Sequence, residues 1–192
     1  MLIKSMCTQR AGIMIQPKDT VRKSQFVIQS QYNQWMNQKL YTVCKEVPDE
    51  TRKKDMGAFF HSIHGTLNHL LLGDRLWMGR FTDTEFQVES LDQELYNDFE
   101  ALWKARNKTD TAINSWFDSL SESDLDQIIA FQAVVTQQTH RFRLADALTH
   151  FFHHQTHHRG QITTLLSQLG CDFGMTDMMW MPGIEIVNMT GG

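Results

Sequence analysis

Four histidines stand within six consecutive positions near the C-terminal end of the chain, at His153, His154, His157 and His158. Residues 144–169 around them have the apolar spacing of one long helix, in which residues four apart lie on one face. Imidazole nitrogens are common ligands of transition metal ions. Either of the two pairs spaced four apart could therefore hold a metal ion.

Helix geometry separates the two pairs. At about 100° per residue, His154 falls within roughly 40° of His158. The apolar residues of this helix fall in the same arc: Phe151, Ile162, Leu165 and Leu169. His157 falls about 100° away and His153 about 140° away, toward solvent. Two imidazoles on an apolar stripe cost free energy unless their nitrogens are satisfied, and a shared metal ion would satisfy both.

A third ligand is predicted from the segment 49–81, which we expect to form one helix. His69 faces a side of this helix that carries the small residues Gly65 and Gly73, and that side would leave room for an ion and its ligand. His61 and His64 fall about 80° and 140° away. A single inward histidine is more often a core residue with a hydrogen-bond partner, so this alternative stays open for His69. Three histidines with one open position would match a catalytic site, because structural zinc sites have four protein ligands.

Further residues are candidates for contacts around such a site. Arg106 falls inside the apolar stripe of the predicted helix 91–120. A salt bridge is the simpler interpretation, and an anchor for an anionic substrate group is the functional one. Gln161 falls about 60° from His158 and could bond a ligand or substrate. The sequence shows no clear general base, for which His157, Gln161 and Asp74 are weak candidates.

The spacing of apolar residues predicts an all-α fold, a four-helix bundle of the up-down type with a long crossover. The predicted helices are 19–47, 49–81, 91–120 and 144–169, and residues 128–143 form either a short hairpin between the third and fourth helices or an extended crossover. A chain of 192 residues fits a single domain, 1–192. About twenty residues at the N-terminus and about fifteen at the C-terminus are expected to be peripheral, and the methionine-rich C-terminal end to pack on a groove or a second subunit.

Composition excludes several classes of protein. The net charge of −4 argues against a nucleic-acid binder, which is usually basic. No apolar run approaches the ~20 residues of a membrane span, and the N-terminus lacks the apolar segment of a signal peptide. Cys7, Cys44 and Cys171 are scattered, which favours a reducing, cytoplasmic location.

Three segments together resemble the DinB-like family of damage-inducible-type four-helix-bundle proteins. They are YNQWMN at 32–37, GAFFHSIHGTLNHLLLGDRLW at 57–77 and HQTHHRGQ at 154–161. The resemblance extends from about residue 31 to residue 177. It implies a metal site at His69, His154 and His158, the three residues selected by helix geometry, and it implies a homodimer.

The resemblance also implies an activity. Some relatives transfer bacillithiol, mycothiol or glutathione, or isomerise thiol adducts. We therefore expect one divalent transition metal ion, zinc or nickel before copper or iron. The expected function is a metal-dependent thiol S-transferase or hydrolase with a low-molecular-weight thiol as partner. The alternatives are a non-enzymatic bundle stabilised by metal and a stress-response protein that binds a small molecule.

Overall fold

The computed structural model describes residues 21–84, 86–134 and 136–184, and this part of the chain is mostly helical. Five α-helices and a small antiparallel sheet are found within it: α1 (Val21–Lys45), α2 (Asp49–Lys53), α3 (Ile63–Phe81), α4 (Phe99–Ser119), β1 (Ile128–Gln132), β2 (Thr139–Arg143) and α5 (Leu144–Gln168). The predictions for the peripheral N-terminus, for Cys7 and for the last eight residues of the C-terminal end lie outside the described residues.

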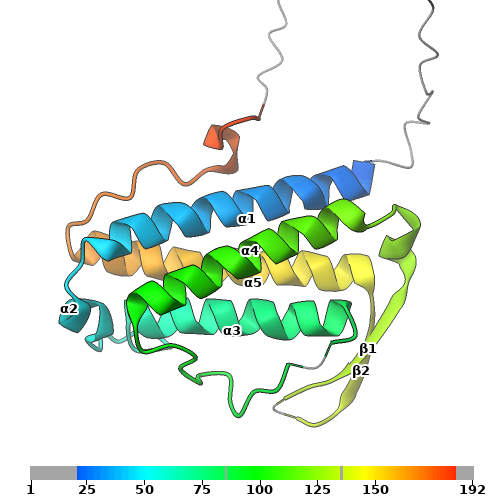
Figure 1. The fold of residues 1–192 in the computed structure, drawn as a ribbon, viewed down its shortest axis with the longest axis horizontal. Helices are drawn as coiled ribbons and strands as arrows, with labels where there is room; N and C mark the ends of the chain where they lie inside the picture. The colour runs from blue at the N-terminus through cyan, green and yellow to red at the C-terminus, as the bar shows by residue number, and fades with distance from the viewer. Residues whose placement is uncertain (1–20, 85, 135, 185–192) are drawn as a thin grey trace, which may run out of the picture.

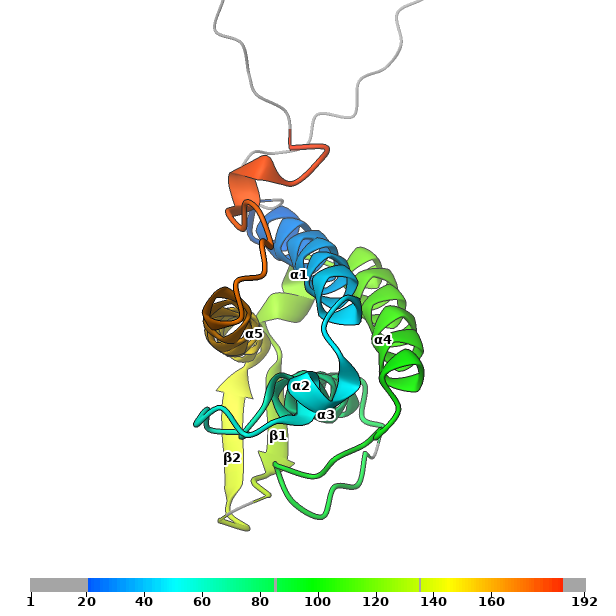
Figure 2. The ribbon, with the colours of Figure 1, turned by 90° about the vertical axis from the view of Figure 1, so that its left-hand side faces the viewer.

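The four long helices lie side by side (Figures 1 and 2). Helix α1 contacts α4 and α5, and α3 contacts the same two helices. Helices α3 and α4 run in the same direction, so the long segment 82–98 carries the chain back between them (Figure 1). The hairpin of β1 and β2 then leads from α4 into α5, which confirms the hairpin as the correct one of the two predictions for residues 128–143.

The prediction of one unbroken helix over residues 49–81 is wrong. Helix α2 ends at Lys53 and α3 begins only at Ile63. Between them, Gly57 (φ +76°) and His61 (φ +63°) adopt left-handed backbone conformations that a right-handed helix does not contain. Ser62 then begins α3 by accepting a hydrogen bond from the backbone N–H of Gly65 at 3.0 Å.

The predicted start of the third helix near residue 91 is also wrong. Helix α4 begins at Phe99, because Asp98 caps it by accepting a hydrogen bond from the N–H of Ala101 at 2.8 Å. The residues before it form a loop on α3, where the N–H groups of Leu95 and Tyr96 both donate to Asn68 Oδ1 at 2.9 Å. Leu95 and Tyr96 are partly buried against the core without being helical, and Leu91 is exposed, which the apolar spacing alone does not reveal.

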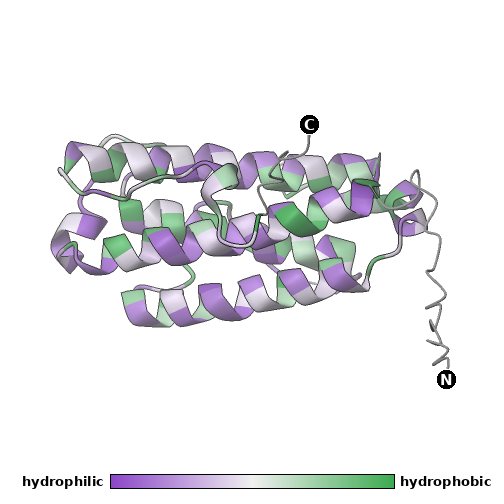
Figure 3. Cartoon of the chain, turned by 90° about the horizontal axis from the view of Figure 1, so that it is seen from above, coloured by the Kyte–Doolittle hydropathy of each residue, from purple (hydrophilic) through white to green (hydrophobic). Residues whose placement is uncertain are grey.

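Polar and apolar residues alternate along the helices (Figure 3), as expected for helices that bury one side. The buried apolar residues form two clusters, one at each end of the four helices. The first includes Met36, Leu40, Leu67, Leu102 and Leu166, and the second includes Phe26, Phe117, Leu148, Phe151 and Phe152. None of the described helices is long and apolar enough to cross a membrane.

Buried polar side chains lie between the two clusters, and we call Asp74, Arg106 and Asp110 the ionic layer. All three are at most 1% exposed. Arg106 Nη1 lies 2.7 Å from Asp74 Oδ2, and Arg106 Nη2 lies 2.7 Å from Asp110 Oδ1. Burial raises the pKa of Asp74 to about 6, although the positive charge of Arg106 acts to lower it. Arg106 is thus paired with two carboxylates inside the core, in agreement with the salt-bridge interpretation of its position.

Replacing Arg106 is expected to destabilise the fold strongly. The change Arg106→Met should lower the free energy of unfolding by about 3–5 kcal/mol, because two buried carboxylates lose their counter-charge. Urea denaturation of the metal-free protein at pH 7 measures this. The control is Arg22→Met, which removes an exposed arginine paired with Glu122 and Asp126 and should have a much smaller effect. Equal effects of the two changes would contradict the stabilising role of the ionic layer.

Candidate metal centre

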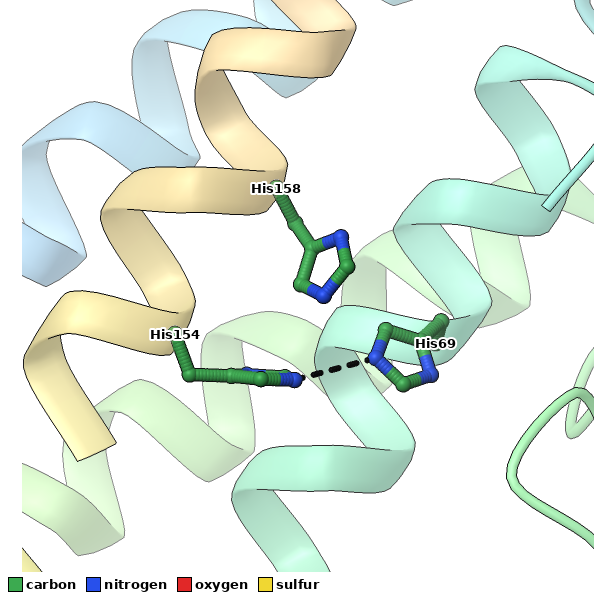
Figure 4. A group of neighbouring side chains, drawn as sticks. All are labelled: His69, His154 and His158. Atoms are coloured by element: carbon green, nitrogen blue, oxygen red, sulfur yellow. Dashed lines mark hydrogen bonds between the residues drawn. The ribbon is translucent and has the colours of Figure 1, made fainter. Parts of the chain in front are cut away.

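Three histidine side chains from two helices converge at the middle of the structure. His69 lies on α3, and His154 and His158 lie one turn apart on α5, which packs against α3. Their rings point toward a common space between the helices (Figure 4). One ring nitrogen of each lies within 4.8 Å of those of the other two. We call these three residues the histidine triad.

The distances within the histidine triad are close to those of a shared metal ion. His69 Nε2 and His154 Nε2 are 3.0 Å apart. The ring centroid of His158 lies 4.5 Å from each of the other two rings. Zinc–nitrogen bonds of about 2.1 Å at a tetrahedral angle would separate the nitrogens by about 3.4 Å. Small side-chain rotations would therefore bring all three nitrogens into coordinating positions.

Hydrogen bonds on the far side of two rings set their protonation. The carbonyl oxygen of Leu91 can only accept, so His69 Nδ1, at 2.8 Å, carries the proton, and Nε2 keeps its lone pair for the centre. His158 Nδ1 lies 2.8 Å from Gln161 Oε1, which acts in the same way. Gln161 Nε2 lies 3.3 Å from His157 Nε2 and completes a short chain of polar contacts. Outer contacts of this kind orient metal-binding histidines in many proteins.

The two glycines of α3 allow close packing, and the prediction that they leave open space for an ion and a ligand is wrong. A Cβ atom on Gly73 would lie 3.0 Å from Cε1 of His154, so the absent side chain makes room for that ring. A Cβ atom on Gly65 would lie 2.2 Å from the carbonyl oxygen of Phe60. Gly65 therefore lets the segment before α3 fold back over the start of the helix.

This close approach places Phe60 over the histidine triad. Its ring stacks on His69 with centroids 3.7 Å apart and meets the edge of His158 at 5.4 Å. Phe60 is itself buried, so it shields one side of both imidazoles from water. The sequence does not reveal this contact, because Phe60 would lie on the side opposite His69 in the continuous helix predicted for residues 49–81.

Burial keeps the three imidazoles neutral. It lowers the pKa of His69 to about 4. The hydrogen bond to the Leu91 carbonyl acts in the opposite direction, and the neighbouring His158 adds a smaller lowering. Burial and the neighbouring His158 and His69 lower the pKa of His154 to about 3. The pKa of His158 is lowered as well, mainly by burial. A metal ligand must be deprotonated, so at neutral pH these rings are already in the form that binds metal.

The remaining histidines of both helices lie outside this group. His153 and His157 are exposed, where the helix geometry placed them. His64 is buried, but its Nε2 bonds the carbonyl oxygen of Tyr96 at 2.9 Å. Asp74, a weak candidate for a general base, is held in the ionic layer and accepts a hydrogen bond from Gln155.

Comparison with known proteins finds relatives of this chain in sequence and in structure. "Protein DinB" of Bacillus subtilis (strain 168) is 28% identical over 157 residues, which cover 77% of this chain and 87% of the relative. The crystal structure of a DinB-like protein from Bacillus cereus ATCC 10987 superimposes with a TM-score of 0.60 at 22% identity, covering 79% of this chain and 95% of that one, and so shares the fold. The family model described as "DinB family" matches residues 21–188, and the chain therefore belongs to the DinB family.

Proposed function

We propose that the histidine triad binds one divalent transition metal ion, zinc or nickel in the first place, and that the protein is a metal-dependent enzyme. The observation that carries the proposal is the convergence of three neutral, preoriented imidazoles from α3 and α5. Nitrogen ligands suit zinc, nickel, copper and iron, and the donor set alone does not choose among them.

Three protein ligands would leave a coordination position open, which distinguishes a catalytic site from a structural one. No fourth histidine, cysteine, aspartate or glutamate of the described residues joins the group. A bound ion would lower the pKa of a thiol or water at that position and so supply a nucleophile at neutral pH. Within the chain, Leu91 and Gln161 would orient two of the ligands, and Phe60 would keep water from one side.

The proposed reaction is thiol S-transfer, with hydrolysis as the second candidate. In S-transfer, a carbon–sulfur bond forms between the thiol and an electrophile, the bond to the leaving group breaks, and the thiol proton passes to solvent. The proposed partner is accordingly a low-molecular-weight thiol. Hydrolysis would use the same open position for water.

Other parts of the proposal concern assembly and location. We interpret the four long helices as a four-helix bundle with a long crossover between α3 and α4. The homodimer is proposed with the exposed Met179 and Trp180 near the C-terminal end as a candidate contact. The negative net charge supports a partner other than nucleic acid. The unpaired Cys44 and Cys171 support a reducing, cytoplasmic location.

Substitution of a triad histidine is expected to abolish stoichiometric metal binding. Elemental analysis of the purified protein should give about one ion per chain, as a three-ligand centre requires, and much less for His69→Ala, His154→Ala and His158→Ala. The matched controls His153→Ala and His157→Ala lie on the same helix but are exposed and should retain the ion. Full retention in His154→Ala or His158→Ala would refute the site.

Removing the hydrogen bond that orients His158 should weaken metal binding without abolishing it. The change Gln161→Leu is expected to reduce metal affinity by about 10–100-fold, the usual effect of losing an outer contact to a ligand. Competition with a metal chelator measures the affinity. Gln168→Leu, two turns further along α5 and exposed, serves as the control and should have no effect. Equal affinities of the two variants would contradict the orienting role.

Metal uptake at pH 6 should release fewer than one proton per ion. Imidazoles with the ordinary pKa of about 6.5 would be mostly protonated at pH 6, and three of them would release about two protons. Since the folded pKa values of His69 and His154 are depressed to about 4 and 3, these rings are neutral at pH 6, and protons compete with the metal only at lower pH. Calorimetric titration with zinc in two buffers of different ionisation enthalpy counts the protons. Release of about two protons would contradict the preformed neutral site.

An open coordination position can be tested with cobalt. Addition of glutathione to the cobalt(II) protein should produce a sulfur-to-metal charge-transfer band, because the thiolate would take the free position. S-methylglutathione, which cannot form a thiolate, is the matched control and should give no band. If no thiol changes the spectrum, the result would favour hydrolysis or simple binding over S-transfer. A fourth protein ligand that nothing displaces would make the site structural and refute the enzyme.

A further inference from the structure

A cleft of about 430 Å³ lies between the β1–β2 hairpin and the neighbouring parts of α3 and α5. Rings dominate its lining: Trp77 from α3, Phe131 from β1, His140 and Phe142 from β2, and His150 from α5. The volume is within the range of small-molecule sites, which are typically concave, apolar and supplied with a few polar groups. The cleft is separate from the metal ligands themselves.

The register of the hairpin produces the aromatic wall of this cleft. Phe131 pairs with His140 and Ile129 pairs with Phe142, and directly paired residues of antiparallel strands share one face of the sheet. On this face the rings of Phe131 and Phe142 stack with centroids 5.9 Å apart, and those of His140 and Phe142 stack at 6.0 Å with an interplanar angle of 11°. Three rings of the hairpin therefore form a continuous surface toward the cleft.

Trp77 forms the opposite wall of the cleft, and contacts with neighbouring side chains fix its position. Trp77 meets the edge of Phe131 at 5.2 Å and lies 5.1 Å from the ring of His150. The guanidinium of Arg80 packs on Trp77 at 4.6 Å and on Phe131 at 4.0 Å. Phe142 nevertheless remains 43% exposed, so part of the aromatic surface has no partner within the described residues.

The cleft lies next to the histidine triad along the same two helices, α3 and α5. Along α5, His158, His154 and His150 follow one another at four-residue spacing, and along α3, His69, Gly73 and Trp77 do the same. The rings of His150 and His154 are 6.1 Å apart. One helical turn, about 5.4 Å, thus separates the end of the cleft from a predicted metal ligand.

We propose that this cleft binds a planar aromatic molecule of one or two rings. Aromatic rings favour offset-stacked or edge-on contacts with other rings, which this lining offers from three elements. Asp146, the one charged residue of the described lining, is ion-paired with Arg143 at 3.2 Å, so an uncharged ligand fits best. The role of this ligand as the electrophile of the reaction rests on the proposed function, whereas its binding in the cleft does not.

Binding can be followed at Trp77 itself. The chain has five tryptophans, so protein labelled with 5-fluorotryptophan should give five fluorine resonances, and Trp77→Phe identifies one of them. Titration of the metal-free protein with 1-naphthol should shift the Trp77 resonance saturably. Decahydro-1-naphthol, of similar size but without aromatic rings, should bind much more weakly. A Trp77 resonance that naphthol leaves unchanged would overturn the proposal.

Three hairpin variants test where the ligand binds. Phe142→Ser should weaken naphthol binding about ten-fold by removing an aromatic contact. Ile128→Ser is the matched control, because Ile128 is similarly exposed but belongs to the other face of the hairpin, and it should have no effect. Phe142→Leu keeps an apolar side chain and should also weaken binding, which supplies the test if the serine variant does not fold. Equal affinities of the Phe142 variants and the control would overturn the proposal.

A separate measurement tests whether the ligand in the cleft lies close to a metal ion bound by the histidine triad. Because the titration uses metal-free protein, it succeeds or fails whether or not the histidine triad binds metal. In the cobalt(II) protein, the ion should broaden the proton resonances of bound naphthol, since the cleft ends one turn from His154. Naphthol that binds at Trp77 without broadening would overturn its role as substrate and leave the metal proposal to its own tests.

Discussion

The contact between two uncharged imidazole nitrogens at the interface of α3 and α5 is the interaction on which the rest of the centre depends. His69 Nε2 and His154 Nε2 are 3.0 Å apart. The bond to Leu91 leaves His69 with a lone pair on this side, so His154 must supply a proton or both nitrogens must share a cation. Burial lowers the pKa values of both rings, which disfavours a protonated imidazolium. A metal ion would satisfy both nitrogens without adding a proton to either ring.

The ionic layer keeps the two helices at the level where this contact occurs. Gly73 and Asp74 are neighbours on α3, and His154 and Gln155 are neighbours on α5. Gly73 packs under the ring of His154, while Gln155 donates to Asp74. Buried polar groups tolerate little displacement, because each lost partner costs the full desolvation of the group that remains. A shift of α5 along α3 would therefore break the Gln155 hydrogen bond and, at the same time, move His154 and His158 away from His69.

Periodicity pointed to the three histidines that the structure brings together, because inward orientation is a local property of each helix. His154 and His158 share the apolar stripe of α5, whereas His69 was selected by the small residues on its side of α3, and the alternative of a core histidine stayed open for it. Periodicity could not predict contacts with backbone segments that are distant in the sequence. The carbonyl of Leu91 and the ring of Phe60 reach the triad only because the chain leaves the helical conformation at His61 and again in the loop before α4. One contact of Arg106 could have been predicted, since Asp110 lies four residues further along α4.

The hairpin and the histidine triad are connected directly through the chain. Strand β2 ends at Arg143 and α5 begins at Leu144, whose N–H bonds the carbonyl oxygen of Gln127 at 2.8 Å beside β1. The direction in which α5 leaves the sheet therefore determines both where His150 meets the aromatic wall and where His154 and His158 meet α3. Since helices are stiff over a few turns, the distance between the cleft and the triad is fixed by backbone geometry rather than by a flexible loop. A ligand in the cleft would then lie at a constant distance from the coordination position proposed for the thiol, which is the condition for proximity to accelerate a reaction between two bound partners.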